Sequence, residues 1–496
     1  MDIKYTIIGT LALMAVGTGA IAMLSNSHEP SDEQDEIIED SVETEENTEE
    51  ETLSEEEEET EEETEPTEDN CEPEPLPLHL NTGGDTFTIA AWNSDEVTVL
   101  LANWLGIDTN EVRNAVNTNK IDGVKCVVFN VGGYCASEYY DSMFIQGDDL
   151  DVYFAEPDWA LQFLDDDSRT APISDIGIPE YQFGYMYDYT LEQCVNTNGV
   201  LKGIPYIACP GCFAYRTDLA EEYLGVLDKD EMQSRIGNWD NFVSAAKEVS
   251  DRSGGQAALA DSIGGISQAY FCGRNKPLVI DGHLDIDDTA KDFESLVREL
   301  WDCGGVSKND QWTDEWYTNI QNGDCMGCFV PVWALQKDTF FIDANCKSYG
   351  KWALCSGPQP YSWGGNMLVV NPYTDNGEEV RDFITSAIYE ENMVKFASQS
   401  SSLPNNINVV QQLIENNFAY DDVTSGNIGG QNYLEIFDEN AKALNLKGLI
   451  TPYDSTIQSD LTSELSYCLS RKSDFDEELD FIKENLALKY PELEIN

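Results

Sequence analysis

Residues 199–249 read GVLKGIPYIACPGCFAYRTDLAEEYLGVLDKDEMQSRIGNWDNFVSAAKEV, and this stretch decides the expected fold. Gly203 and Pro205 interrupt the chain before an apolar run, which predicts a turn leading into a strand near Tyr206–Tyr215. A helix is expected from Thr217 and a second from about Asn238. The second helix should bury one face, because apolar residues recur at helical spacing at Trp239, Phe242, Val243, Ala246 and Val249.

The same alternation of strand and helix continues along most of the chain. The segment Thr86–Trp92 alternates as a strand, and further strand-like runs lie at 124–129 and 151–154. Helical spacing follows the first strand, recurs over Glu378–Tyr389, and appears once more after Ser473, which we expect to cap the last helix. This order predicts an α/β fold with largely parallel sheets.

Three motifs in residues 199–249 resemble the family 1 extracellular solute-binding proteins, which are the sugar-binding proteins of bacterial ABC importers. The family pattern is a YGIPY strand, a YN-D-L step from strand to helix, and a TWDEF…AKKL helix. Here the matches are Gly203–Tyr206, Tyr215–Leu219 and Asn238–Phe242, with Arg216 where the family has Asn. The order and spacing of the three are more specific than any one motif.

The resemblance extends over residues 85 to the C-terminus. Further matches are Leu150–Trp159, Ile320–Trp333, Lys351–Pro358 with Ser362–Gly365, Leu403-Pro404 and Ile450–Asp454. It implies a solute-binding domain over 81–496 with the two-lobed, type II periplasmic-binding-protein fold. The first lobe would comprise about 85–205 and 360–405. The second would comprise about 206–356 and 406–496, with a ligand cleft at the hinge between them.

The first 80 residues are unlike the rest. Residues 5–24 are apolar and uncharged, long enough to cross a bilayer, and follow Lys4. They indicate, within residues 1–28, either an uncleaved anchor or a signal peptide cleaved near Ala20-Ile21-Ala22. No lipobox Cys is present, which favours the anchor. Residues 29–80 are rich in Glu and Thr and are expected to be a disordered stalk or, alternatively, a calcium-binding tract. The domain should therefore be tethered outside the cell membrane.

The composition excludes several partners and chemistries. Residues 29–75 contain 26 Asp or Glu and no Lys or Arg. Without them the formal net charge of the chain would still be −41, compared with −67 for the whole chain. Such a field repels nucleic acid and anionic lipid. With only His28, His79 and His283, neither a multi-His metal site nor His-based nucleophilic catalysis is expected. No phosphate-binding glycine motif is present, so no cofactor is expected.

The predicted ligand site rests on aromatic and acidic residues at strand ends. Sugars pack their C–H faces on aromatic rings, and their hydroxyls pair with carboxylates and amides. Trp104, Trp239 and Trp352 are interpreted as core residues. The candidates for the cleft are Trp92, Glu156, Asp158, Tyr206, Trp333, Trp363, Gly364 and Tyr453.

Thirteen cysteines are unusual for the resembled family. Cys71 lies in the stalk and has no assigned role; the twelve others form an even number in an exported protein, which favours disulfides. Cys346 and Cys355 are a plausible local pair. Buried free thiols, a Cys₄ zinc site and a redox role remain alternatives, the last two because of two C-x-x-C pairs. The disulfide candidates are Cys126, Cys135, Cys194, Cys209, Cys212, Cys272, Cys303, Cys325, Cys328, Cys346, Cys355 and Cys468.

These features predict a monomeric, non-catalytic protein that captures a mono- or oligosaccharide and delivers it to the permease subunits of an ABC transporter. Two alternatives stay open. A carbohydrate-active enzyme needs only two carboxylates, which are abundant here. A surface sensor or adhesin would use the same cleft to signal or attach.

Overall fold

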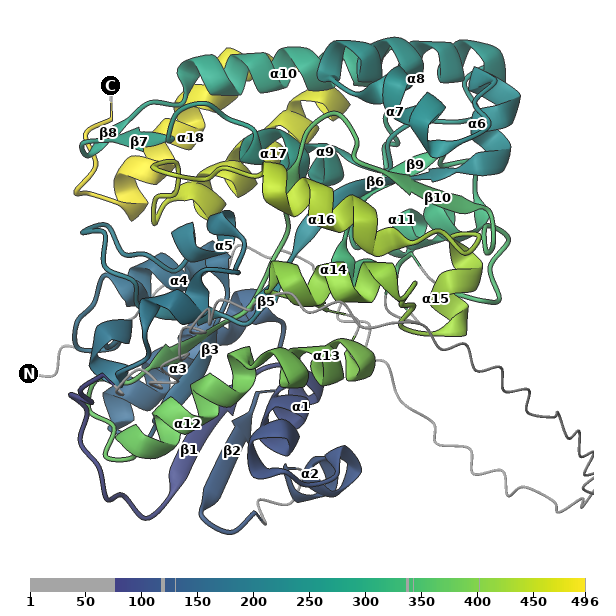
Figure 1. The fold of residues 1–496 in the computed structure, drawn as a ribbon. Coiled ribbons are helices and arrows are strands. Elements are labelled where there is room, and N and C mark those ends of the chain that lie inside the picture. Colours follow the sequence, from purple (N-terminus) through teal and green to yellow (C-terminus); the bar gives the residue numbers. More distant parts are fainter. Residues whose placement is uncertain are drawn as a thin grey trace, which may run out of the picture. The chain divides into compact units, whose positions relative to one another are not determined.

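Two β-sheets organise the part of the chain that the computed structural model describes, which is residues 76–116, 121–129, 131–335, 339–341, 343–400 and 402–495 (Figure 1). The first sheet has five strands in the order β2-β1-β3-β12-β4. The second has β10, β11 and β9 paired with β6. We refer to each sheet with its helices as the first and second lobe. The strands of the first sheet are β1 (Phe87–Ala91), β2 (Val124–Val128), β3 (Val152–Ala155), β4 (Gly203–Pro205) and β12 (Met367–Val370).

The helices of the first lobe pack around β1, β3 and β12. The α-helix α1 begins after Asn93, whose side chain accepts hydrogen bonds from the amides of Asp95 and Glu96, and ends at Gly106, which has a φ of 67°. The helices are α1 (Ser94–Leu105), α2 (Thr109–Val116), α3 (Ala136–Gln146), α4 (Pro157–Leu164), α5 (Asp188–Glu192), α12 (Gly377–Ile388) and α13 (Glu390–Gln399). Short 3-10 turns are η1 (Gly133–Cys135), η2 (Ile173–Ile176), η3 (Glu180–Phe183) and, in the second lobe, η4 (Val332–Leu335).

The second lobe is built from β6 and its partners, covered by helices from two distant parts of the chain. Figure 1 shows α17 and α18 of the C-terminal region beside the earlier helix α10. The strands are β6 (Pro210–Arg216), β9 (Gly327–Pro331), β10 (Trp352–Cys355), β11 (Tyr361–Ser362) and the hairpin β7 (Val279–Ile280) with β8 (His283–Leu284). The helices are α6 (Thr217–Leu224), α7 (Lys229–Ile236), α8 (Trp239–Ser253), α9 (Ile263–Cys272), α10 (Asp287–Asp302), α11 (Asp314–Asn322), α14 (Ile407–Glu415), α15 (Asp422–Asn427), α16 (Tyr433–Ala443), α17 (Asp454–Arg471) and α18 (Phe475–Lys489).

The expected elements around residues 199–249 are confirmed. β6 follows Pro205, α6 begins at Thr217, and α8 begins after Asn238, whose side chain accepts a hydrogen bond from the amide of Asn241. Phe242, Val243, Ala246 and Val249 are buried, as their spacing predicts. Trp104 and Trp239 pack against the hydrophobic cores, and Trp352 is fully inside one. The last helix departs slightly from expectation, because Asp474 and not Ser473 caps it, accepting from the amide of Asp476.

The prediction of largely parallel sheets is wrong except for the pairing of β1 with β2 and β3. β1 runs parallel to β2 and β3, but β12 is antiparallel to both β3 and β4, and every partner of β6 is antiparallel to it. The cause is the path of the chain. It leaves the first sheet after β4, builds the second sheet, and then re-enters the first sheet from the opposite direction as β12.

The chain passes between the two sheets three times. The first crossing joins β4 to β6 through β5 (Ile207–Ala208), and the second joins β11 to β12. The third runs from α13 to α14 through β13 (Leu403–Pro404), which pairs antiparallel with β5. One hydrophobic cluster runs continuously from β1 and α1 through these crossings onto β6 and α16. The crossings are therefore part of a packed core.

The disulfide prediction is wrong. All twelve cysteines of the described region are free thiols, eight of them buried. Cys328 lies on β9 and Cys325 in the extended segment before it, where residues three apart are separated by roughly 10 Å, too far for a disulfide. Cys346 contacts the hydroxyl of Ser348, whereas Cys355 is buried on β10 and donates to the carbonyl of Phe213. The thiols instead pack as small apolar side chains, and burial raises the pKa of Cys126 to about 12.

The N-terminal predictions fall mostly outside the described residues. The apolar stretch 5–24 and residues 29–75 lie there, and within the described residues no helix is long and apolar enough to span a membrane. The C-terminal boundary expected for the stalk, residue 80, is wrong, however. The amide of His79 donates to the carbonyl of Asp175 at 2.8 Å, and Leu80 packs on the core of the first lobe. Residues 76–80 therefore belong to the folded domain.

Candidate functional site

Two adjoining hollows separate α4 of the first lobe from α9 and α17 of the second. We call them together the cleft. They share Asp158, Gln268, Ser455 and Gln458. The larger, of about 440 Å³, is also lined by Ser262, Ile263, Gly264, Ser267, Trp301, Ser307, Lys308, Asn309, Asp310, Gln311, Trp312, Ser459, Thr462, Ser463 and Ser466. The smaller, of about 100 Å³, is also lined by Pro157, Leu161, Gln193, Cys272, Arg274, Ser362, Gly364, Leu446, Ile450, Thr451 and Asp454.

Three tryptophans form one aromatic cluster beside the cleft. The rings of Trp312 and Trp333 are nearly parallel, with centroids 6.4 Å apart, and Trp363 lies 5.7 Å from Trp333 and 5.9 Å from Trp312. The indole N–H of Trp333 donates to the carbonyl of Trp363 at 3.1 Å, which fixes the two segments together. Trp312 is the accessible member, with 45% of its surface exposed. Such a surface suits the apolar face of a ligand.

Trp312 was not among the residues predicted from the sequence. It has a φ of 70°, a conformation that costs a bulky residue roughly 1–3 kcal/mol. The packing of its ring on Trp316, at 5.1 Å, and on Phe340, at 5.7 Å, holds it there. Backbone strain concentrates at binding sites, but no feature of the sequence Asp310–Thr313 reveals it beforehand.

Glu156 supplies an acceptor behind the smaller hollow. It precedes the first turn of α4, and its Oε2 atom is buried without a hydrogen-bond partner. Gly133 makes room for it, since a Cβ there would lie 2.6 Å from Oε2 and 2.9 Å from the indole nitrogen of Trp92. Burial, reinforced by the nearby charge of Asp158, raises the pKa of Glu156 well above its usual value. An unpaired carboxyl group in this position is poised to accept a ligand's hydrogen bond.

Asp158 lies in the first turn of α4 and lines both hollows. Its carboxyl group is accessible from the cleft, while protein surrounds its other sides, and this desolvation raises its pKa. Two donors complement these acceptors. Nε of Arg274, which lines the smaller hollow, and Nε2 of Gln311, which lines the larger, are both buried without a partner.

Comparison with known proteins identifies the chain. The model of a family described as bacterial extracellular solute-binding protein matches residues 118–422. The chain belongs to this family. No curated protein matches it in sequence.

Solved structures share the fold of this solute-binding protein at low sequence identity. One is described as an extracellular solute-binding protein of family 1, with a TM-score of 0.66, 15% identity, and coverage of 82% of this chain and 98% of that one. The GacH receptor of Streptomyces glaucescens has a TM-score of 0.59 and 14% identity, covering 82% and 100%. An ABC-transporter-associated binding protein from B. animalis subsp. lactis, in complex with β-1,6-galactobiose, has a TM-score of 0.60 and 18% identity, covering 84% and 100%. The predicted two-lobed α/β fold is thereby confirmed.

The solute-binding protein brings together some of the residues predicted for its site. Asp158 and Gly364 line the cleft, and a Cβ on Gly364 would lie 3.5 Å from the indole nitrogen of Trp333 and 3.7 Å from Oε1 of Glu156. Trp363 belongs to the aromatic cluster. Trp92 is half-buried, with its ring 6.0 Å from Phe154 and 6.2 Å from Trp159. Gly133 lies next to both the indole of Trp92 and the carboxyl group of Glu156. Trp92 itself lines neither hollow.

Two predicted residues lie elsewhere. Tyr206 is 2% exposed and its hydroxyl donates to Oε2 of Glu96, so it is part of the core at the crossings. Tyr453 packs its ring 4.9 Å from Tyr490 and donates to Glu492 at 3.3 Å. It therefore fastens the C-terminal segment beside α17 and lines neither hollow.

A buried carboxylate joins the three crossings. Glu96 on α1 accepts hydrogen bonds from Tyr206 at 2.5 Å, Asn366 at 2.6 Å and Ser402 at 3.2 Å. Each donor comes from a different crossing. Burial raises the pKa of Glu96, and the three hydrogen bonds oppose that rise. The first lobe of this solute-binding protein thus anchors all three hinge segments at one carboxyl group.

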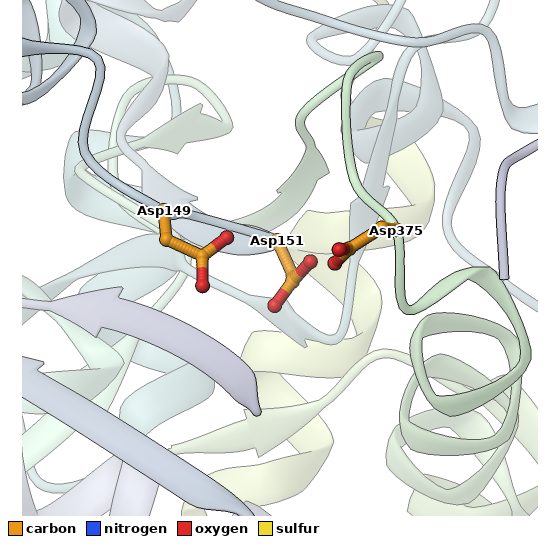
Figure 2. A group of neighbouring side chains, drawn as sticks. All are labelled: Asp149, Asp151 and Asp375. Atoms are coloured by element: carbon orange, nitrogen blue, oxygen red, sulfur yellow. The ribbon is translucent and has the colours of Figure 1, made fainter. Parts of the chain in front are cut away.

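A second acidic group lies in the first lobe, away from the residues that line the cleft. Figure 2 shows the neighbouring carboxyl groups of Asp149, Asp151 and Asp375, whose oxygens lie within 4.8 Å of one another. Asp151 is buried and already accepts from the amide of Thr88 at 2.6 Å, from the hydroxyl of Thr374, and from Asn376 at 3.2 Å. Oxygen ligands of this kind suit a hard cation. The hydrogen bonds of Asp151 give the cluster a structural role, because Asp151 connects the start of β3 to β1 and to the segment after β12.

Proposed function

We propose that this solute-binding protein captures an uncharged carbohydrate in the cleft and delivers it to the permease subunits of an ABC transporter. The observation that carries the proposal is the pairing of the accessible Trp312 ring with buried, unpartnered hydrogen-bonding atoms of Glu156, Arg274 and Gln311. A sugar needs both, an aromatic surface for its C–H face and fixed polar atoms for its hydroxyls. Solved relatives of the same fold are described in complex with acarbose, maltose, β-1,6-galactobiose and lacto-N-biose.

The charge at the cleft argues against an anionic solute. Arg274 donates to Asp454 at 2.6 Å and is thereby neutralised. Among the residues that line the cleft, Asp158 and Asp310 then outnumber Lys308, whose ammonium group lies 4.9 Å from the centre of the Trp301 ring. The long-range field of a chain with a formal charge of −67 acts in the same direction.

The proposal includes no catalysis. Closure of the lobes around the solute would create the form that docks on the permease, with the Glu96 network as the point about which the crossings bend. We place the domain outside the cell membrane, tethered or released according to the fate of residues 1–28. The rival proposal is a glycosidase acting through Glu156 and Asp158, which would release product on incubation with oligosaccharides.

A thermal-shift screen tests the function. Monosaccharides and oligosaccharides are compared with amino acids and short peptides, using the chain from residue 76. A ligand at about 100 times its Kd should stabilise the protein by roughly 2.7 kcal/mol. Stabilisation by amino acids or peptides alone would refute the sugar assignment, and stabilisation by sugars followed by product release would favour the enzyme.

A further inference from the structure

The polar face of α17 is unusual for this chain. Of 496 residues 94 are Asp or Glu, so a surface helix of eighteen residues is expected to place acids on its solvent side. α17 carries two such acids, Asp460 and Glu464, which are half-buried beside the buried residues Ile457, Leu461 and Leu465. The stripe that faces the larger hollow has no charge at all and consists of Ser455, Gln458, Ser459, Thr462, Ser463 and Ser466. We call it the serine stripe.

The serine stripe is long, and two of its six residues, Gln458 and Thr462, are held by hydrogen bonds within the protein. Ser455 and Ser466 are separated by about 16 Å along the helix at 1.5 Å per residue. Thr462 and Gln458 bond to the hydroxyl of Ser267 on α9, at 2.7 and 3.3 Å. The hydroxyls of Ser455, Ser459, Ser463 and Ser466 have no partner within the described part of the chain. Across the hollow, the amide of Gln311 is also unpartnered and buried.

The hollow has the size of a ligand site and continues from the smaller one. Its volume of about 440 Å³ falls within the roughly 300–1,000 Å³ typical of small-molecule sites. Ser455 and Gln458 belong to both hollows, and Trp312 lines the larger one. A chain of sugar rings that starts at the aromatic cluster therefore has a continuous path along the stripe.

We propose that the serine stripe is an extended subsite for the second and later rings of an uncharged oligosaccharide. The first ring contacts Trp312 and the polar atoms near Glu156, and the following rings hydrogen-bond to the hydroxyls of α17 and to Gln311. This inference rests on the proposed function and adds to it the class of solute, an oligomer with unmodified hydroxyls. Carboxylated or sulfated chains are disfavoured, because Asp158 and Asp310 lie on the same path and Lys308 is the one basic residue among the described residues that line the larger hollow.

Calorimetry with sugars of increasing length tests the subsite. The probes are glucose, maltose, maltotriose and maltotetraose, and the matching β-1,4 series from cellobiose to cellotetraose. Affinity in at least one series should rise about tenfold or more between one and three rings, the equivalent of roughly 1.4 kcal/mol. Ser459→Arg and Ser463→Arg place a long side chain in the path from exposed positions. They should remove the gain in affinity with chain length.

The matched control is Ser470→Arg, an exposed serine of α17 outside the stripe, which adds the same charge and should retain the gain. Affinity that does not increase with length, or an equal loss in all three variants, would overturn the extended subsite while sugar binding itself stands. Binding of no sugar in either series, together with no stabilisation by any sugar in the thermal-shift screen, would refute the proposed function as well as the subsite.

Discussion

The hydroxyl of Tyr206 donates to the carboxyl group of Glu96 at 2.5 Å, across 110 residues of sequence. The two residues are 2% and 5% exposed, so the bond lies in the core. Asn366 and Ser402 bind the same carboxyl group. The hinge of this solute-binding protein therefore contains a carboxyl group whose ionisation is penalised by burial and favoured by three donors.

Removing one donor from this network should destabilise the protein. Tyr206→Phe deletes a hydrogen bond to a charged group, and we expect a loss of roughly 1.5–3 kcal/mol in the free energy of unfolding. Ser402→Ala, whose bond is longer, should cost less. Urea unfolding monitored by tryptophan fluorescence measures both. An unchanged midpoint for Tyr206→Phe would mean that Glu96 is not held as the distances indicate.

The raised pKa of Glu156 makes the stability of the unliganded protein depend on pH. Below the ordinary pKa of Glu, both folded and unfolded states hold the proton and the folded state has its full stability. As pH rises, the unfolded state loses the proton first, so stability falls until the raised pKa of the folded state is passed. Glu156→Gln should reduce this fall between pH 4 and 8. Exposed Glu477 on α18 provides the control Glu477→Gln, and equal pH curves for the two variants would contradict the prediction.

The aromatic cluster should contribute to binding more than to folding. Trp312→Ala and Trp363→Ala are expected to weaken sugar binding by roughly 2–4 kcal/mol, the range of strong contact residues. Trp352→Ala, in the core at 1% exposure, should instead cost about 3–5 kcal/mol of stability. Calorimetry and urea unfolding on the same proteins separate the two effects. A large stability loss with unchanged binding would assign Trp312 and Trp363 to the core.

The backbone of Trp312 gives a sharper test of strain. Glycine adopts a φ of 70° without the steric penalty that a Cβ imposes there. Trp312→Gly should therefore be more stable than Trp312→Ala by roughly 1 kcal/mol. At most positions in a folded protein, a glycine variant is less stable than the alanine variant. If Trp312→Ala is the more stable variant here as well, the loop relaxes once the ring is removed.

The boundary of the folded domain predicts the effect of truncation. A chain that starts at residue 76 should unfold at the same midpoint as the longer protein. A chain that starts at residue 85 loses the packing of Leu80 and three backbone hydrogen bonds of 2.8 Å, from His79 to Asp175, from Gly84 to Asp375 and from Gly377 to Asn81. We expect a loss of roughly 1.5–4.5 kcal/mol, since each bond contributes about 0.5–1.5 kcal/mol. Identical midpoints would indicate that residues 76–84 add nothing to stability.

Local patterns predicted the helices well. α8 and α12 were predicted because apolar residues recur at helical spacing, as at Phe242 and Phe383. Long-range contacts were not visible in the same way. Tyr206 was assigned to the ligand because its neighbours match a family motif, whereas its partner Glu96 is fixed only by the folded arrangement. Trp312 was missed because its exposure depends on a loop conformation that its residue types do not indicate.

The cysteine prediction failed for a related reason. An even number of cysteines in an exported chain is a statement about composition, and it contains no information about which thiols approach one another.

Free thiols in the core should react slowly with an alkylating reagent in the native protein and quickly after unfolding. Intact-mass measurement with and without denaturant checks this for the twelve described cysteines.

The position of β12 has a consequence for how the protein is made. This strand lies inside the first sheet, between β3 and β4, yet it follows β4 by more than 160 residues. A ribosome working at about 5–20 residues per second needs on the order of ten seconds or more to supply it. During that time β3 and β4 lack the strand that joins them, and their unpaired edges are open to wrong partners. The sheet of the first lobe can therefore be completed only after the second sheet has been synthesised. A holding chaperone would act in that interval by covering β3 and β4.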